Sequence, residues 1–171
     1  MATVQDNLLA WLKDAYAMEQ QAIEILEKQP PMLNDYPDMQ AKVRDHIEQT
    51  RSQAERLRTC LQRHGTDTSA LKTGMAQLTG NVTAMMGSMS SDAVVKQAIA
   101  DYAFENFEIA NYRALISAAE EAGDMETRRV CEEILREEEA MASWIEDHLP
   151  VVTRQYLQRD ADMQYRSARG G

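Results

Sequence analysis

The sequence predicts an all-α protein: a four-helix bundle made of two antiparallel helical hairpins that a long crossover connects. Composition is the first observation, since 7 Gly and 4 Pro residues are few beside 11 Met residues, and strand-rich chains need more turn and β-branched residues. Periodicity is the second, because four long segments repeat apolar residues at spacings of three and four. The third is the length of the links, which are short within each pair of segments and long between the pairs.

The first hairpin is expected in the N-terminal part of the chain. Its first helix spans residues 4–28 and follows Thr3, a residue type that caps helix N-termini, and it stops before two consecutive prolines. Its second helix spans residues 37–64, beginning with a proline, which is favoured in a first helical turn, and ending before Gly65. Because the link between them is short, the two helices should run antiparallel.

The second hairpin is expected in the C-terminal half. Its first helix follows a cap at residues 90–92 and ends at Gly123, and its second helix follows a cap at Asp124. This last helix should reach about Leu149, because Pro150 comes next.

One domain is expected from the length of the chain. Residues 1–150 form the helical bundle, and residues 151–171 form a C-terminal extension that is partly helical or disordered. Between the hairpins, residues 66–90 form the crossover, which is expected to contain a short fifth helix broken by glycines.

The formal net charge of −10 argues against a nucleic-acid backbone as the partner, because phosphate binding needs a basic surface. No apolar run is long enough for a membrane span, and the N-terminus lacks the basic and apolar regions of a secretory signal. The two cysteines, Cys60 and Cys131, are too few for a disulfide framework. We therefore expect a cytoplasmic protein that binds neither nucleic acid nor membrane.

Potential metal ligands lie on or beside the apolar stripes near the middle of the predicted helices. In an antiparallel hairpin, residues equally far from the turn face each other, because each helix rises about 1.5 Å per residue. This rule pairs Glu19 with His46 in the first hairpin. It pairs Glu108 with Glu138 in the second hairpin, with Glu105 one turn away. Each of the four helices thus carries a potential ligand at a similar level.

Burial of several carboxylates in one layer is costly through desolvation and mutual repulsion, and a bound cation removes both penalties. Carboxylate-bridged metal pairs in helical bundles take a Glu from each of two helices and Glu-x-x-His from the other two. Oxygen ligands combined with imidazole favour iron or manganese. The chain contains no Glu-x-x-His, and Gln49 follows His46 at the spacing where a carboxylate would serve. We expect one or two ions of iron or manganese, or no ion at all.

The same residues also have a purely structural interpretation. Consecutive glutamates at 137–139 are typical of a solvated face, on which at least one of them must lie. The acids of the third helix could instead form surface ion pairs with Arg113 or Lys96. A lone core histidine such as His46 is more often hydrogen-bonded than metal-bound.

The chain contains four segments with a characteristic order and spacing: DAYAMEQQ, HIEQTRSQAERL, FENFEIANYRALISAAEEAGD and ILREEEAMASWI. Over about residues 5–150 the sequence resembles the YciE/YciF group of bacterial ferritin-like stress proteins. The resemblance implies a ferritin- or rubrerythrin-like bundle, commonly a homodimer, with a proposed ferroxidase role. By position, it carries the family's metal-site residues onto Glu19, His46, Glu105, Glu108, Glu137 and Glu138. The chain departs from the family, whose members often have Glu, His and an acidic residue, at Gln49, Asn106 and Ala142.

Two functions from different classes fit these observations. In the first, iron binds in the bundle core, with ferroxidase or peroxide-linked activity, and the ligands are Glu19, His46, Gln49, Glu105, Glu108 and Glu138. In the second, no metal binds, and the chain is a homodimer with a structural or partner-binding role in stress. The polar layer then fixes the register of the helices, with Glu19 and His46 as an ion pair.

Overall fold

The computed structural model describes residues 1–66 and 92–169, and within these ranges all regular structure is helical. A single 3-10 turn, η1 (Pro30–Met32), lies between the first two long helices. The long helices are α1 (Val4–Leu26), α2 (Pro37–Arg63), α4 (Ala93–Glu121) and α5 (Met125–Arg169). The all-α prediction is confirmed, and the short helix expected in the crossover lies outside the described residues.

Local sequence signals set the helix ends. At the start of α1, Thr3 Oγ1 accepts the Asp6 N–H at 3.1 Å, and the Asp6 carboxylate accepts the Thr3 N–H at 2.8 Å, which completes a capping box. Gly65 and Gly123 follow the last turns of α2 and α4 with φ of +70° and +72°, a left-handed conformation that strains any side chain. The helix ends of these elements therefore lie within about two residues of the predicted ones.

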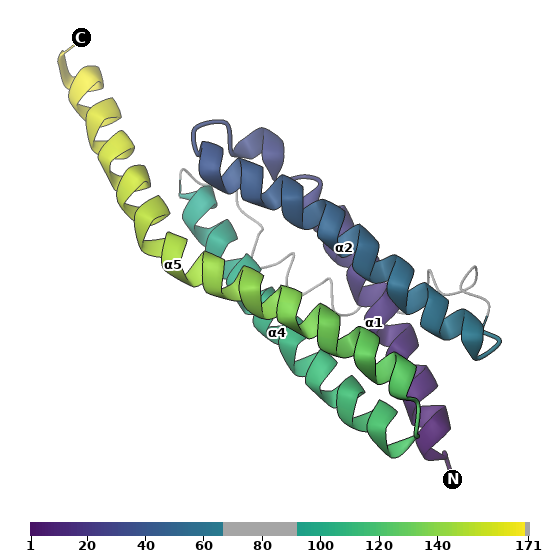
Figure 1. Ribbon diagram of the computed structural model, residues 1–171. Coiled ribbons are helices and arrows are strands. Elements are labelled where there is room, and N and C mark those ends of the chain that lie inside the picture. The colour runs from purple at the N-terminus through teal and green to yellow at the C-terminus, as the bar shows by residue number, and fades with distance from the viewer. Residues whose placement is uncertain (67–91, 170–171) are drawn as a thin grey trace.

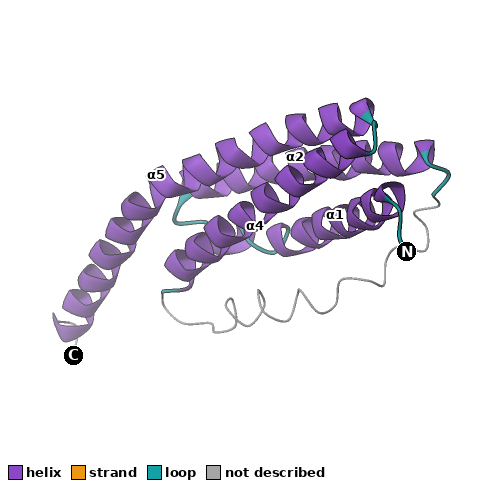
Figure 2. Cartoon of the chain, turned by 90° about the horizontal axis from the view of Figure 1, so that it is seen from below, coloured by secondary structure: helices purple, strands orange, loops and turns teal. Residues whose placement is uncertain are grey.

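The helices pack as two antiparallel hairpins, α1 with α2 and α4 with α5, which lie against each other in one bundle (Figure 1 and Figure 2). Two buried apolar clusters, each with members from all four helices, fill the bundle. The first cluster includes Leu12, Leu57, Leu115 and Ile134, and the second includes Leu26, Val43, Ala98 and Val152. Along every helix, buried polar residues lie between the members of the two clusters.

The last helix does not end before Pro150, as the sequence predicted, but continues through it to Arg169. Proline lacks the N–H for one helical hydrogen bond, a loss of about 3 kcal/mol in a helix interior. Burial of Val152 in the second cluster offsets part of this loss, whereas the pair between Arg159 and Asp35, at 2.5 Å, is exposed to solvent and adds little. The whole stretch 151–169 is helical, and its distal end projects beyond the bundle in Figure 1. The domain boundary at residue 150 stays a prediction.

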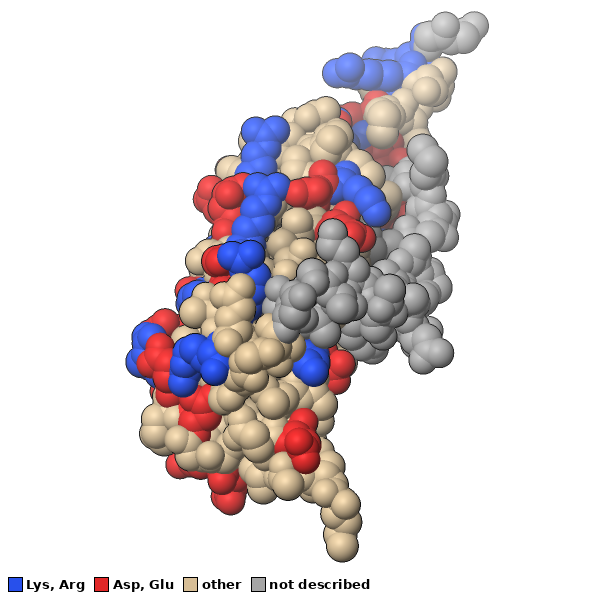
Figure 3. All heavy atoms as spheres, turned by 90° about the vertical axis from the view of Figure 1, so that its right-hand side faces the viewer, with Lys and Arg blue, Asp and Glu red and all other residues tan. Residues whose placement is uncertain are grey.

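The surface carries charges of both signs. On the face seen in Figure 3, Lys and Arg side chains form a column with Asp and Glu beside it. Exposed ion pairs of this kind contribute little to stability. Among the residues that the structure describes, no helix combines the length and the apolar content that crossing a bilayer requires.

Asp124 ties the start of α5 to the end of α2. Its Oδ1 accepts the Thr127 N–H at 3.1 Å and its Oδ2 accepts the Thr127 hydroxyl at 2.5 Å, which caps α5. The same carboxylate receives His64 Nε2 at 2.6 Å and Arg63 Nη2 at 3.2 Å from the end of α2. One side chain therefore fixes the ends of both hairpins to each other.

Replacement of Asp124 by Ala should lower the free energy of unfolding by about 1–2 kcal/mol, because α5 loses its cap. Urea unfolding followed by circular dichroism would measure the change. Asp92→Ala is the matched control, because Asp92 also precedes a helix, α4, and its carboxylate forms an exposed pair with Lys96 at 2.9 Å instead of a side-chain cap. It should lose less than about 0.5 kcal/mol. An equal loss in the two variants would contradict the role of Asp124.

Candidate metal centre

A layer of buried polar side chains crosses the middle of the bundle and separates the two apolar clusters. Each helix contributes to it at positions that its apolar periodicity turns inward. Every member is exposed by 2% or less: Glu19 from α1, His46 and Gln53 from α2, Glu105 and Glu108 from α4, and Glu138 from α5. The sequence prediction that each helix carries a potential ligand near its middle is thus consistent with this burial.

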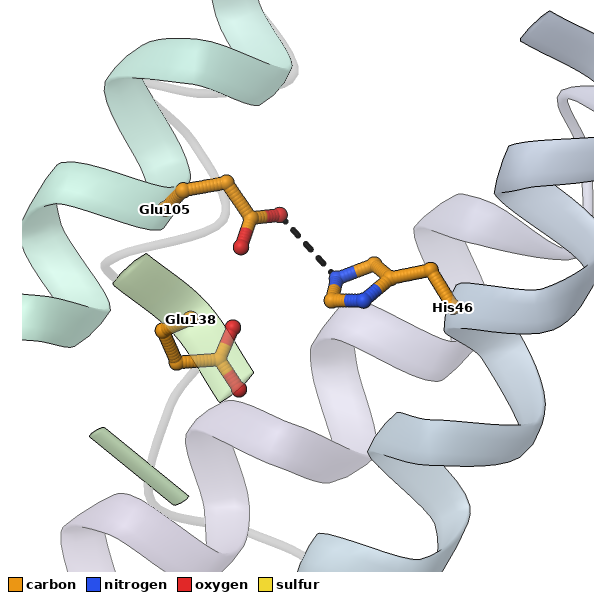
Figure 4. A group of neighbouring side chains, drawn as sticks. All are labelled: His46, Glu105 and Glu138. Atoms are coloured by element: carbon orange, nitrogen blue, oxygen red, sulfur yellow. Dashed lines mark ion pairs between the residues drawn. The ribbon is translucent and has the colours of Figure 1, made fainter. Parts of the chain in front are cut away.

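Three side chains converge at the centre of the layer from α2, α4 and α5 (Figure 4). His46, Glu105 and Glu138 each offer one ligand atom, and these atoms all lie within 4.8 Å of one another. His46 Nε2 lies 3.1 Å from Glu105 Oε1. An imidazole nitrogen and two carboxylates in this arrangement form a possible ligand set for a hard divalent cation.

Two further glutamates lie beside this centre. The Tyr112 hydroxyl, which is fully buried, donates a hydrogen bond to Glu19 Oε1. Burial raises the pKa of Glu108, and repulsion from Glu19, Glu105 and Glu138 raises it further. The two residues therefore belong to the same layer as the central three.

The four glutamates leave buried oxygens without hydrogen-bond partners. Within the described part of the chain, the unpartnered atoms are Glu19 Oε2, Glu105 Oε2, Glu108 Oε1 and Glu138 Oε2. A buried polar atom without a partner costs about 1–3 kcal/mol, and more when it is charged. A cation that these oxygens bind would remove the penalty for all of them at once.

Burial raises the pKa of every glutamate in the layer. Burial, followed by repulsion from Glu138, raises the pKa of Glu19 to about 8. Burial, followed by repulsion from Glu105, raises the pKa of Glu138 to about 9. Burial likewise raises the pKa of Glu105 to about 8, although the hydrogen bond from Glu138 opposes it, and raises that of Glu108 well above the ordinary value. Without a cation, the layer holds protons at neutral pH.

Two glutamines contact the central residues. Gln49 Oε1 lies 3.4 Å from His46 Nδ1, and a neutral ring whose Nδ1–H points to this acceptor keeps its lone pair on Nε2, the atom that faces Glu105. Gln53 Nε2 donates to Glu138 Oε1. Hydrogen bonds of this kind orient metal ligands in proteins. The assignment of Gln49 as a ligand stays a prediction.

The side-chain pairing in the layer differs from the pairing that the sequence predicted. Equal distance from a turn places two residues at the same level along a hairpin, but it does not fix their angle around the helix. His46 pairs with Glu105 of the other hairpin, and not with Glu19. Glu138 lies in the central group with His46 and Glu105, and the predicted common level of Glu108 and Glu138 stays a prediction.

The surface interpretation of these acids is wrong. Glu105 and Glu108 are each only 2% exposed, and Arg113 and Lys96 pair with other carboxylates. Of the glutamates at 137–139, the central one is buried while its two neighbours reach the surface. The expectation that part of this run is solvated is therefore confirmed.

The structure also shows which sequence departures affect the layer. Asn106 is exposed and donates to the Tyr102 carbonyl at 2.8 Å, so a histidine at this position would lie outside the layer. Met141 and Ala142 are buried and apolar, so α5 supplies Glu138 to the layer without a second carboxylate one turn on.

Gln53 and Tyr112 lie at helical spacing from predicted ligands: Gln53 two turns after His46 on the same face of α2, and Tyr112 one turn after Glu108 on α4. One further buried acid, Asp101, escaped the sequence reasoning about the site. Asp101 lies one turn before Glu105, where its Oδ1 accepts from the side chains of Gln29 at 2.9 Å and Gln97 at 2.7 Å.

Comparison with known proteins supports the fold. A family model described as "Domain of unknown function (DUF892)" matches residues 3–158. A solved protein from Xanthomonas campestris pv. campestris is 32% identical, with a TM-score of 0.81, over 93% of this chain and 99% of its own. The stress protein YciF of E. coli is 23% identical, with a TM-score of 0.73, over 87% of this chain and 96% of its own.

A bacterioferritin with a diiron site, from Desulfovibrio desulfuricans, has the same fold. It is 22% identical, with a TM-score of 0.71, over 93% of this chain and 91% of its own. The predicted ferritin-like four-helix bundle is therefore confirmed.

The metal-free protein should lose stability as the pH rises from about 4.5 to about 9, by on the order of 5 kcal/mol. Between these values the folded layer keeps protons that the unfolded chain, whose glutamates titrate near 4.5, has lost. Glu138→Gln mimics the protonated carboxyl, so its stability should depend less on pH. Urea unfolding with a chelator present, at about pH 5.5 and about pH 8.5, would test this.

The matched control is Glu139→Gln, because Glu139 is exposed and pairs with Arg113 at 2.8 Å. It should keep the pH dependence of the unsubstituted protein. A Glu138→Gln variant with the same pH dependence as Glu139→Gln would contradict a protonated Glu138.

Proposed function

The chain belongs to the DUF892 family, as its resemblance to the YciE/YciF group predicted, and from this premise we propose that it is a ferritin-like stress protein that binds iron in its polar layer. The proposal comprises one or two ions, with manganese as the alternative metal. On the basis of the family, the proposal also includes a homodimeric assembly and a cytoplasmic location.

One observation carries the proposal: four buried glutamates, each with an unpartnered oxygen, share one layer of the bundle with a buried histidine. A layer that served only to fix helix register would be expected to satisfy its buried polar atoms internally, since unsatisfied ones destabilise the fold. The protonated carboxyls and the open oxygens instead resemble a ligand set awaiting a cation. Its carboxylate and imidazole groups match the preferences of iron and manganese.

The residues divide into a complete set for one ion and a thinner set for a second. His46 through Nε2, together with Glu105 and Glu138, would hold the first ion. Glu19 and Glu108, from the same layer, would hold a second ion. The second position has no histidine of its own, so its affinity should be lower.

Bound iron would supply one-electron chemistry toward dioxygen or peroxide, which is the basis of a ferroxidase activity. The residues of the chain prepare the site for the ion. Tyr112 holds one oxygen of Glu19 and Gln53 holds one oxygen of Glu138, so the remaining oxygens are free to bind. The apolar clusters on both sides exclude bulk water, which strengthens every charge interaction inside the layer.

Anaerobic titration with Fe(II) should give saturable binding by the unsubstituted protein. Glu138→Gln should weaken it by about 100-fold or more, because it removes a ligand rather than an outer contact. Isothermal calorimetry at neutral pH would measure both the affinity and the protons released as the glutamates lose them to the buffer.

Glu139→Gln removes the same charge from the neighbouring surface position and should bind Fe(II) like the unsubstituted protein. If Fe(II) bound no better to the unsubstituted protein than to Glu138→Gln, the metal-free structural role would replace this proposal. Oxidation of the bound Fe(II) by dioxygen or hydrogen peroxide, followed by the absorbance of the ferric product, would then test turnover separately.

A further inference from the structure

A chain of polar side chains between α2 and α5 connects the buried layer to the surface. Exposure rises along it: the Gln53 and Glu138 residues are 0% and 1% exposed, whereas the Arg56, Glu137 and Glu133 side chains are 23%, 28% and 35% exposed. Since the layer lies in the middle of the bundle, an ion must cross packed side chains to reach it. This polar chain is one place where carboxylate and amide groups extend over that distance.

Each member of this chain contacts the next. Gln53 Nε2 donates to Glu138 Oε1 inside the layer and to Glu137 Oε2 at 3.0 Å outside it. Arg56 Nη2 pairs with the same Glu137 carboxylate, and Arg56 Nη1 lies 3.8 Å from Glu133 Oε2. One amide therefore joins a half-buried carboxylate to a proposed ligand of the metal.

A second, independent observation indicates a ligand here. Gln53 Oε1 is buried and has no hydrogen-bond partner, and the same holds for Glu138 Oε2. Amide carbonyl and carboxylate oxygens are the groups that hard cations bind. The Arg56 guanidinium lies at the carboxylates of Glu133 and Glu137, so a cationic group already occupies this position.

We propose that Glu133, Glu137 and Gln53 form an entry site for divalent cations, from which the ion passes to Glu138. Arg56 neutralises this entry site until an arriving ion displaces it. The inference rests on the proposed function, because the entry site leads to the layer that would bind the metal.

The other side of Glu138 provides a contrast within the same helical turn. Glu139 is 44% exposed and pairs with Arg113, which is itself 65% exposed. Glu137 and Glu139 thus have the same charge, flank the same proposed ligand and each pair with an arginine. They differ in their contact with Gln53, which Glu137 makes and which joins it to the layer.

Stopped-flow mixing with Co(II), followed by its visible absorbance, tests the entry site in the full chain. Glu137→Gln should lower the association and dissociation rate constants together by about fivefold to tenfold, since a carboxylate on the path raises the on-rate of a cation by electrostatic attraction. The Kd should stay within about twofold, because a residue on the path acts equally on entry and exit. Loss of a ligand would instead raise the Kd.

Two more variants complete the test. Arg56→Gln removes the resident positive charge and should raise the association rate constant by about fivefold. Glu139→Gln should leave the association rate constant within about twofold of the unsubstituted value, since its charge lies off the path. Circular dichroism of each variant confirms that it is folded, and the Glu133→Gln/Glu137→Gln double variant should show a larger decrease than Glu137→Gln alone.

The outcomes distinguish the two proposals. Unchanged rate constants in Glu137→Gln and in the double variant, with normal Co(II) affinity, would overturn the entry site alone. Equal decreases in Glu137→Gln and Glu139→Gln would also overturn it, because overall charge would then explain both. A raised Kd in Glu137→Gln would make this residue a ligand. Absence of Co(II) binding by the unsubstituted protein would overturn the proposed function and the entry site together.

Discussion

The burial of four carboxyl groups in one layer is the constraint on which the rest of this structure depends. Removing a charged carboxylate from water is so unfavourable that these groups stay protonated, share protons or await a cation. The helices must bring them together to place their apolar residues correctly, since Glu19 lies on α1 between Met18 and Ala22, which belong to the two different clusters. Packing of the apolar residues therefore brings the carboxyl groups together, and their buried charge has to be neutralised by protons or by a cation.

Hydrogen bonds within the layer satisfy only some of the carboxyl oxygens. Tyr112 and Gln53 each satisfy one carboxylate oxygen, and His46 satisfies one of Glu105. These contacts also position the groups, because a carboxylate held at one oxygen presents the other in a fixed direction. The oxygens that remain without a hydrogen-bond partner indicate a site for a hard metal ion, and so does the combination of carboxylate and imidazole groups. Arg56 and Glu137 extend this chemistry toward the surface.

The sequence predicted those parts of the fold that depend on neighbours along the chain. Capping residues and glycines located the helix ends to within a turn, because caps and left-handed glycines act locally. Helical period placed the four glutamates and His46 inside. The exception among the ends was Pro150, where the helix continues through a local helix breaker and packs Val152 into the second cluster.

Pairing within the site could not be predicted in the same way. Counting residues from a turn gives the height of a side chain along its helix, whereas contact also requires its angle and the arrangement of the hairpins. Glu105 therefore meets His46 across the bundle instead of staying one turn from the centre. Gln53 went unrecognised because an amide on a buried face suggests no metal chemistry until its neighbours are known.

Because the core is divided into two apolar clusters, the residues that stabilise the fold are largely distinct from those that would bind a metal. Each cluster draws on all four helices, so packing on either side of the layer can hold the bundle together. Substitutions in well-separated regions have nearly additive effects on stability. A residue of the layer can therefore be replaced by an uncharged one without unfolding the protein. In such a bundle, metal chemistry can be weakened, retuned or rebuilt by changes in one thin layer.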